Sequence, residues 1–275
     1  MASREFPITD VDLDRIQSLA YDFTGIVLGN NKKDMIYARL SRRIRSLGLS
    51  NFDQYCDLLD QACSVEQSNF INAITTNLTA FFRENHHFDY LRDTVIPELK
   101  EKNKLSRKLR IWSAGCSTGE EPYSLAIVLN EAIDIKSWDV KILATDLNSD
   151  VLGHAQNGVY DVSRIESIDS GLKEKWFLRD AGNPELVKVK PALSRPISFK
   201  RLNLLEGWPM KGRFDVIFCR NVVIYFNKDT QRILFDRYAD ILADGGYLFI
   251  GHSETLHRVS DRFESLGRTI YRKKC

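Results

Sequence analysis

Apolar side chains recur at helical spacing from residue 10 to about residue 101. Leu13, Ile16 and Ala20 share one face of a helix that we expect to end near Gly25. The same spacing predicts further helices over 36–47, after a cap at residue 50 or 51, over 65–74, and from Arg83 towards residue 100. Because no strand pattern interrupts this region, the first part of the chain is predicted to be all helical.

The pattern changes at Leu109, where short apolar runs begin to alternate with helical segments. Strands are predicted over 109–114, 140–145, 197–202, 214–219, 246–251 and 268–273, the last of which can return antiparallel. This alternation predicts an α/β domain with a mostly parallel sheet and crossover helices. Between the second and third strands lies an irregular insertion, 157–196, in which the alternation over 186–189 predicts a small β-hairpin.

A strand, a turn with two glycines and a helix follow one another over residues 111–123, IWSAGCSTGEEPY. Gly115 and Gly119 let the backbone pass close to a ligand, although such glycines also serve tight packing alone. Glu121 falls in the first turn of the helix, where its carboxylate suits the helix dipole or holds a cationic or amino group. Asp146 ends the next strand, where it can bond a ribose or cap the following helix.

The pattern at this turn excludes two common nucleotide sites. The chain has no Gly-Lys-Ser/Thr sequence here for a phosphate-cradling loop and no GxGxxG fingerprint for a dinucleotide. Acidic groups without a phosphate cradle suit a nucleoside that carries a positive charge and no phosphate. S-adenosylmethionine is such a ligand.

Two later strands end in polar residues at the same predicted rim. Asn203 follows the third strand, and Arg220 and Asn221 follow the fourth. Ligands of open α/β sheets bind at the carboxyl ends of the strands, so these positions favour a binding role over turn formation alone. Tyr225 and Phe226 come next; at least one is expected in the core, and a tyrosine hydroxyl near the pocket is the sharper interpretation.

The overall composition says little about the ligand, but it bears on the charge of the protein surface. The 275 residues are 43% hydrophobic and carry a net charge of +2, so any basic surface must be local. One such surface is predicted at 32–45, which holds six basic residues and one acidic residue, and it can bind an acidic helix or a phosphate backbone or remain a solvated face.

The cysteines and the apolar runs indicate in which cellular compartment the protein is expected. The five cysteines, at positions 56, 63, 116, 219 and 275, show no CxxC spacing, which predicts reduced thiols and no metal site. The first residues lack an apolar signal region, and no run reaches the ~18 apolar residues of a membrane span. We therefore expect a cytoplasmic protein that does not insert into the membrane.

Four ordered blocks together resemble the bacterial chemotaxis receptor methyltransferases of the CheR family. The blocks are TTNLTAFFRE at 75–84, WSA at 112–114 with STGEEPYS at 117–124, FCRNV at 218–222 with IYF at 224–226, and GHSE at 251–254. The resemblance implies a Rossmann-like methyltransferase domain over 109–275 that uses S-adenosylmethionine and releases S-adenosylhomocysteine. It also implies a helical receptor-recognition domain over 1–76, a linker and helix over 77–108 that contribute to the cofactor site, and a small β-subdomain within 157–196.

The resemblance also implies a reaction and a set of site residues. The family esterifies glutamate side chains on the cytoplasmic helices of membrane chemoreceptors. Carried over by motif, the cofactor-binding residues are Asn77, Thr79, Arg83, Glu121, Asp146, Asn203, Leu204, Arg220 and Asn221. Arg83 and Tyr225 are implied nearest the transferred methyl group, and Arg39, Arg42, Arg43 and Arg45 are implied to face the receptor.

Two other functions remain open at this point. A methyltransferase acting on nucleic acid would place the basic helix on phosphates, and a non-catalytic module would only sense S-adenosylmethionine. One region departs from part of the family: the loop 179–185 is not the glycine-rich form of members that grip a receptor tether. Tether binding is therefore not carried over to this chain.

Overall fold

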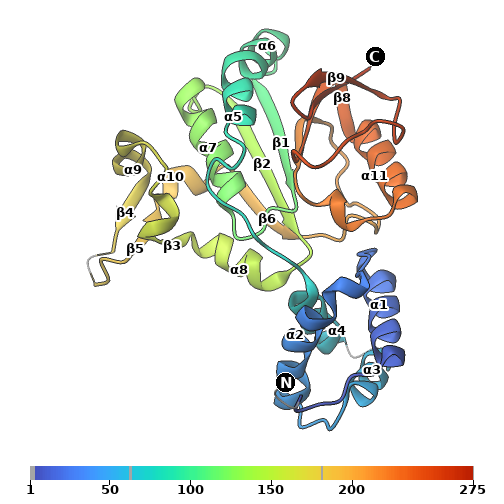
Figure 1. Cartoon of the computed structure of the whole chain (residues 1–275). Coiled ribbons are helices and arrows are strands. Elements are labelled where there is room, and N and C mark those ends of the chain that lie inside the picture. The colour runs from blue at the N-terminus through green and yellow to red at the C-terminus, as the bar shows by residue number, and fades with distance from the viewer. Residues whose placement is uncertain (1–3, 62–63, 181, 275) are drawn as a thin grey trace.

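A computed structural model describes residues 4–61, 64–180 and 182–274. A bundle of helices at one end of the molecule adjoins a large α/β body, and a small inserted subdomain projects from the side of that body (Figure 1). The linker after the helical bundle runs across the junction between these parts.

The helical domain contains α1 (Asp10–Thr24), η1 (Asn30–Lys32), α2 (Lys33–Ser46), α3 (Phe52–Asp60) and α4 (Ser64–Ile74). Thr9 begins α1 with a capping box to Asp12, and Gly25 ends it in the left-handed conformation. Of the two caps considered for α3, Asn51 is the one used, because its side chain accepts from the Gln54 amide. The apolar stripes meet in a core of their own, so the domain has an independent interior.

Three short helical segments lead from the linker to the sheet. They are α5 (His86–Tyr90), the π-helical η2 (Leu91–Val95) and α6 (Ile96–Lys102). Their apolar side chains, Phe88, Leu91 and Ile96 among them, join the core on one face of the sheet. The predicted helix after Arg83 thus exists, but a π turn interrupts it.

The central sheet has seven strands in the order β6-β2-β1-β7-β8-β10-β9. The five parallel strands are β1 (Lys108–Ala114), β2 (Asp139–Asp146), β6 (Ile197–Arg201), β7 (Phe214–Cys219) and β8 (Leu242–Ile250). Helix α7 (Glu120–Ala132) packs with the α5–α6 segment on one face, and α11 (Lys228–Ile241) covers the other. Helix α8 (Ser149–Asn157) follows β2. The predicted α/β class is confirmed.

The end of the chain differs from the single strand predicted over 268–273. It forms an antiparallel hairpin of β9 (Phe263–Gly267) and β10 (Ile270–Lys273), and β10 pairs antiparallel with β8. Arg268 and Thr269 turn the chain with positive φ angles. Strand β9 was missed because four of its five residues are exposed, which leaves no alternating apolar pattern.

The insertion carries a three-stranded antiparallel sheet in the order β3-β5-β4, where a hairpin was predicted. Its elements are β3 (Val159–Asp161), η3 (Val162–Ile165), α9 (Ser170–Trp176), β4 (Phe177–Arg179), β5 (Leu186–Val189) and α10 (Pro191–Ser194). Strands β4 and β5 form the hairpin, and β3 adds the third strand. Ala181, within the loop that departs from the tether-binding form, lies outside the described residues.

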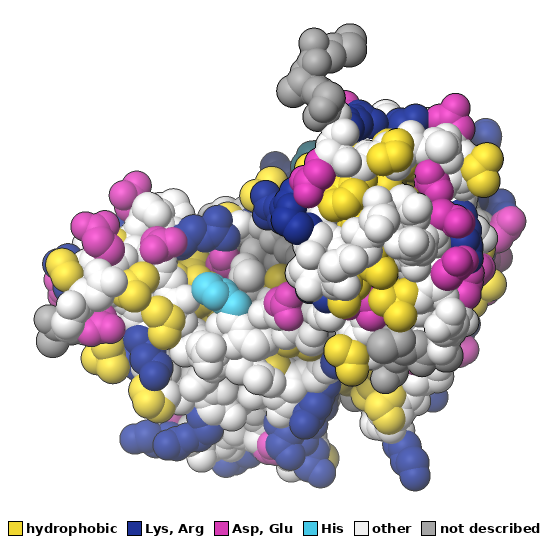
Figure 2. Space-filling model, turned by 90° about the horizontal axis from the view of Figure 1, so that it is seen from below, with side chains coloured by type: hydrophobic (Ala, Val, Ile, Leu, Met, Phe, Trp, Pro, Cys, Tyr) yellow, Lys and Arg dark blue, Asp and Glu magenta, His cyan; other side chains and the backbone are white. Residues whose placement is uncertain are grey.

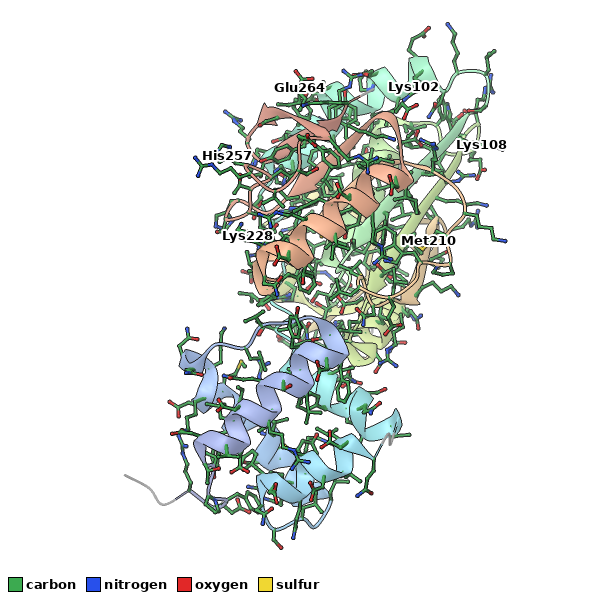
Figure 3. The ribbon with its side chains drawn as sticks, turned by 90° about the vertical axis from the view of Figure 1, so that its right-hand side faces the viewer. Lys102, Lys108, Met210, Lys228, His257 and Glu264 are labelled. Carbon is green, nitrogen blue, oxygen red and sulfur yellow. The ribbon has the colours of Figure 1, made fainter. Side chains whose placement is uncertain are left out.

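The α/β body is oriented with the carboxyl ends of its parallel strands towards the helical domain. Lys108, at the start of β1, and Lys102 lie at the far end of the body, whereas Lys228, at the start of α11, lies near the helical domain (Figure 3). The polar strand ends therefore face the junction between the domains, where a ligand of an open α/β sheet is expected.

Candidate functional site

A pocket at this junction is lined by the helical domain, the linker and the strand ends together. Seen from the helical end, the molecule is hollowed between the inserted subdomain and the helical domain, and Lys and Arg side chains border the hollow (Figure 2). All residues implied for the cofactor or the methyl-transfer centre line this one pocket: Asn77, Thr79, Arg83, Glu121, Asp146, Asn203, Leu204, Arg220, Asn221 and Tyr225.

The turn after β1 forms part of the pocket wall. Gly115 has a φ of 88°, and a Cβ there would lie 2.4 Å from Cγ2 of Val222. The backbone amides of Gly115 and Cys116 both donate to the Thr145 carbonyl, which fixes the turn against the end of β2. Only glycine therefore lets the chain pass at this point, which assigns Gly115 to the close approach that the sequence suggested.

Asp146 anchors the same turn through its carboxylate. Oδ2 accepts from the Ser117 amide at 2.8 Å, and Oδ1 accepts from the Asn148 amide at 2.9 Å. The N-cap of α8 is Asn148, so Asp146 does not have the capping role that the sequence allowed. Burial raises the pKa of Asp146, although the backbone donors oppose this. Each oxygen retains acceptor capacity for a ligand hydroxyl.

Glu121 is held in a buried polar cluster at the pocket. Its Oε1 accepts from the Ser113 hydroxyl at 2.7 Å, and its Oε2 lies 3.3 Å from Nη1 of Arg220. Burial raises the pKa of Glu121 in spite of the opposing charge of Arg220. The Nε of Arg220 is buried without a hydrogen-bond partner among the described residues. Arg220 pairs with the carboxylates of Glu121 and Glu84, and its unpaired Nε leaves one donor for an acceptor group of a ligand.

Asn203 connects the two domains. Its Nδ2 donates to the Phe23 carbonyl of α1 at 3.1 Å and to Glu206, while its Oδ1 accepts from the Leu205 amide. Leu204, next in the chain, is buried against the sheet core and lines the pocket. Asn203 therefore both forms the turn, through its bond with the Leu205 amide, and lines the pocket.

The linker lies over the pocket and is fixed at several backbone carbonyls. The Asn77 carbonyl accepts from the Ser117 hydroxyl at 2.8 Å, and the Thr79 carbonyl accepts from Arg164 of the insertion at 2.8 Å. The same Arg164 pairs with Glu120, whose side chain is almost fully buried. Arg83 donates from Nη1 to the Leu78 carbonyl at 2.8 Å, which holds its guanidinium within the pocket lining.

The helical domain contributes a wall that sequence reasoning missed. This wall consists of Thr24, Ile26, Val27, Leu28, Lys32, Met35 and Ile74. The amide of Val27 donates to the Tyr225 carbonyl at 2.9 Å, which joins the loop after α1 to η4 (Val223–Tyr225). A signal was present, because three consecutive apolar residues at 26–28 follow a helix-ending glycine where a surface loop would be polar.

Three of the four arginines implied to face the receptor have partners inside the chain. Arg39 donates to the carbonyls of Ala73 and Thr75, and Arg45 pairs with Glu5. Arg43 forms two hydrogen bonds with Glu66, whose side chain is 5% exposed. Arg42 is exposed and has no such partner among the described residues. The basic run of the sequence is thus in part an internal framework of α2.

The structure describes three of the five cysteines. Cys56, Cys116 and Cys219 are free and buried, whereas Cys63 and Cys275 lie outside the described residues. Within the described ranges, no three His, Cys, Asp or Glu side chains come together as a metal site. In those same ranges no helix combines the length and the apolar character needed to cross a membrane.

Comparison with known proteins gives matches over nearly the whole chain. A family model described as "CheR methyltransferase, all-alpha domain" matches residues 11–75, and one described as "CheR methyltransferase, SAM binding domain" matches residues 77–272. The chemotaxis protein methyltransferase 2 of Pseudomonas aeruginosa is 44% identical over 98% of this chain and 95% of its own. The probable chemotaxis protein methyltransferase of Rhizobium etli is 43% identical over 92% of this chain and 96% of its own. The chemotaxis protein methyltransferase of Escherichia coli is 41% identical over 96% of this chain and 91% of its own.

Proposed function

The chain belongs to the CheR family of chemotaxis protein methyltransferases that use S-adenosylmethionine, and we propose that it methylates glutamate side chains on the cytoplasmic helices of membrane chemoreceptors. The products are glutamate methyl esters and S-adenosylhomocysteine, and the reaction takes place in the cytoplasm. The observation that carries this proposal is the composition of the pocket, in which residues from both matched domains line one cavity.

The residues of the pocket divide the work of binding the methyl donor. S-adenosylmethionine supplies an electrophilic methyl group on a sulfonium. Asp146 offers carboxylate oxygens to ribose hydroxyls, and Glu121 offers one to an ammonium group. Asn77 and Thr79 bring the linker over the ligand, Asn203 and Leu204 border the adenosine, and Arg220 and Asn221 complete the rim. The two carboxylates thus meet the hydroxyl and cationic groups of the donor.

Positioning is the main contribution of the chain to the reaction. A glutamate with a pKa of ~4.3 is already a carboxylate at neutral pH, so no general base is needed. Arg83 and Tyr225 lie in the lining where the acceptor carboxylate must arrive, and Arg83 orients a carboxylate there by charge and hydrogen bonding. Ile26, Leu28 and Ile74 of the helical wall limit the access of water while opposite charges neutralise each other in the transition state.

Receptor recognition is assigned to the helical domain. We expect the exposed Arg42 to contact acidic groups of the receptor directly. Arg39, Arg43 and Arg45 present charge on the same helix, but their internal partners also give them a structural task. Nucleic acid is not the expected partner, because the basic residues that would meet phosphates are largely paired within the chain.

The test is methyl transfer from radiolabelled S-adenosylmethionine to receptor-containing membranes. We expect label on the receptor that base releases as methanol, which is the behaviour of a methyl ester. Label on added RNA or DNA would favour the nucleic-acid methyltransferase instead. Binding of S-adenosylmethionine without any transfer would favour the sensing module.

Arg83→Ala should lower this methyl transfer about 100-fold, because the acceptor or the donor loses its orienting cation. The fold should persist, since among the described residues the side chain of Arg83 hydrogen-bonds only to the nearby Leu78 carbonyl. Arg92→Ala is the matched control, because Arg92 is exposed, forms ion pairs with Asp89 and Asp93, and is not among the residues that line the pocket. Normal turnover by Arg83→Ala would remove Arg83 from the mechanism.

A further inference from the structure

The linker loop that carries Arg83 has an unfavourable backbone conformation on both sides of that residue. Phe82 has a φ of 53° and Glu84 has a φ of 56°. Residues other than glycine, asparagine and aspartate rarely adopt such left-handed angles, and two of them so close together need support from their surroundings. The contacts that hold this loop therefore decide where Arg83 lies.

Glu84 provides four polar contacts through a side chain that is 10% exposed. Its Oε1 lies 2.9 Å from Nδ1 of His252 and accepts from Nδ2 of Asn221 at 3.4 Å. Its Oε2 faces Nη2 of Arg220 at 3.4 Å and Nδ1 of His87 at 3.5 Å. One carboxylate thus contacts the segments after β7 and after β8 and the start of α5.

The same partners reach the backbone of the loop. Arg220 donates from Nη2 to the Arg83 carbonyl, and the Phe82 amide donates to the Ser124 hydroxyl at 3.0 Å. Burial alone would raise the pKa of Glu84, but the hydrogen bond with His252 and the charge of Arg220 lower it to about 2. Glu84 is therefore a carboxylate at neutral pH.

We propose that Glu84 is a positioning residue for methyl transfer: its carboxylate fastens the strained linker loop to Arg220, Asn221 and His252, and thereby sets Arg83 in the pocket. This inference rests on the proposed function, in which Arg83 acts on the reacting groups. Glu84 does not line the pocket itself, so its effect must pass through Arg83 and Arg220.

Two substitutions separate the carboxylate from the backbone strain. Glu84→Gly accepts the left-handed φ without cost and removes the carboxylate, whereas Glu84→Ala removes the carboxylate and keeps the strain. We expect both to lower kcat/KM for receptor methylation about 100-fold, the scale of a small misplacement of a reacting group. Wild-type turnover by Glu84→Gly would show that the carboxylate is dispensable and overturn the proposal.

A double-mutant cycle tests whether Glu84 acts through Arg83. Once Glu84→Gly has released the loop, adding Arg83→Ala should lower kcat/KM less than about threefold further, since the two residues act as one unit. If the two losses multiply instead, Glu84 does not position Arg83. Asp89→Asn is the matched control, because Asp89 is a half-buried carboxylate on α5 that pairs with Arg92 away from the pocket.

A readout independent of the acceptor keeps this inference distinct from the proposed function. Release of the loop should expose the bond after Arg83 to trypsin, so limited digestion of Glu84→Gly should cut there faster than in wild type or Asp89→Asn. Unchanged cleavage would contradict the proposal even if wild type left receptors unlabelled. If Glu84→Gly and Glu84→Ala do not fold, as judged by melting temperature, the near-isosteric Glu84→Gln serves both assays.

Discussion

The α/β wall of the pocket and the helical wall differ in how their residues are held. On the α/β wall, the half-buried Asp146 and the buried Glu121 are held in place by backbone amides and a serine hydroxyl. On the helical wall, Ile26, Val27 and Leu28 belong to a loop that reaches the other domain by the hydrogen bond between Val27 and Tyr225. The α/β wall is built from the ends of the sheet strands, whereas the helical wall belongs to another domain that contacts the α/β body.

This difference assigns separate tasks to the two walls. Fixed carboxylates on a sheet edge suit a ligand with the same polar groups in every turnover, which is the methyl donor. The helical wall, where Val27 is exposed at the pocket, suits the acceptor that we propose, a receptor glutamate whose surroundings vary from one site to the next. Changes in the α/β wall should therefore act on donor affinity, and changes in the helical wall should act on the acceptor.

The largest effect is expected from Gly115→Ala in the α/β wall. The new Cβ would lie 2.4 Å from Val222 in a left-handed conformation, and strain of about 3 kcal/mol corresponds to about 100-fold weaker binding. Calorimetry with S-adenosylhomocysteine measures this loss. Gly153→Ala on α8 is the control, because nothing lies within 4 Å of its added Cβ and helix propensity should raise stability slightly. Equal affinities for the two variants would contradict a rigid α/β wall.

A smaller effect, on stability, should distinguish two neighbouring arginines of the helical domain. Burial alone would raise the pKa of Glu66, but hydrogen bonds from Arg43, Asn69 and Tyr55 hold it below its usual value. Arg43→Ala leaves that buried carboxylate without its cation but with the Tyr55 and Asn69 donors, and should lower the free energy of unfolding by about 2 kcal/mol.

Arg42→Ala should leave the free energy of unfolding unchanged and weaken only receptor binding, because Arg42 is exposed. Chemical denaturation and receptor pull-down measure the two quantities. Both variants are compared at a temperature where they are folded. If Arg43→Ala then weakens receptor binding more than Arg42→Ala does, Arg43 contacts the receptor directly.

The smallest effect is expected from Val27→Ser in the helical wall. Val27 is 51% exposed at the pocket, and loss of its apolar contact with the acceptor should cost about 1 kcal/mol, or about fivefold in KM for the receptor. The affinity for S-adenosylhomocysteine should stay the same. Ile233→Ser, which is 60% exposed on α11 and outside the pocket lining, is the control. A change confined to donor affinity would mean that the two walls share one task.

Sequence patterns predicted the α/β wall well, for a physical reason. The carboxyl ends of parallel strands meet at one edge, so once the strands were placed, Asp146, Asn203 and Arg220 had to converge. The linker residues Asn77, Thr79 and Arg83 came only from the family resemblance, because nothing in their spacing predicts that a segment before β1 folds over the strand ends.

The partners of the charged residues could not be predicted in this way. Arg43 and Glu66 are 23 positions apart and meet only after α2 packs on α4. Glu84 lies 168 positions from His252, and nothing in the sequence marks its left-handed φ. A sequence gives the spacing of charges along one helix, but the pairing of charges follows from tertiary contacts.

The hydrogen bond between Val27 and Tyr225 has a consequence for the order in which the molecule is made. Domains form as units from the amino terminus during synthesis, so the helical domain, with its own core, can fold while the rest of the chain is still on the ribosome. Its loop acquires the Tyr225 carbonyl only when residue 225 of the 275 has emerged. A nascent or truncated chain would therefore display a finished helical domain beside a pocket that cannot yet close on its donor.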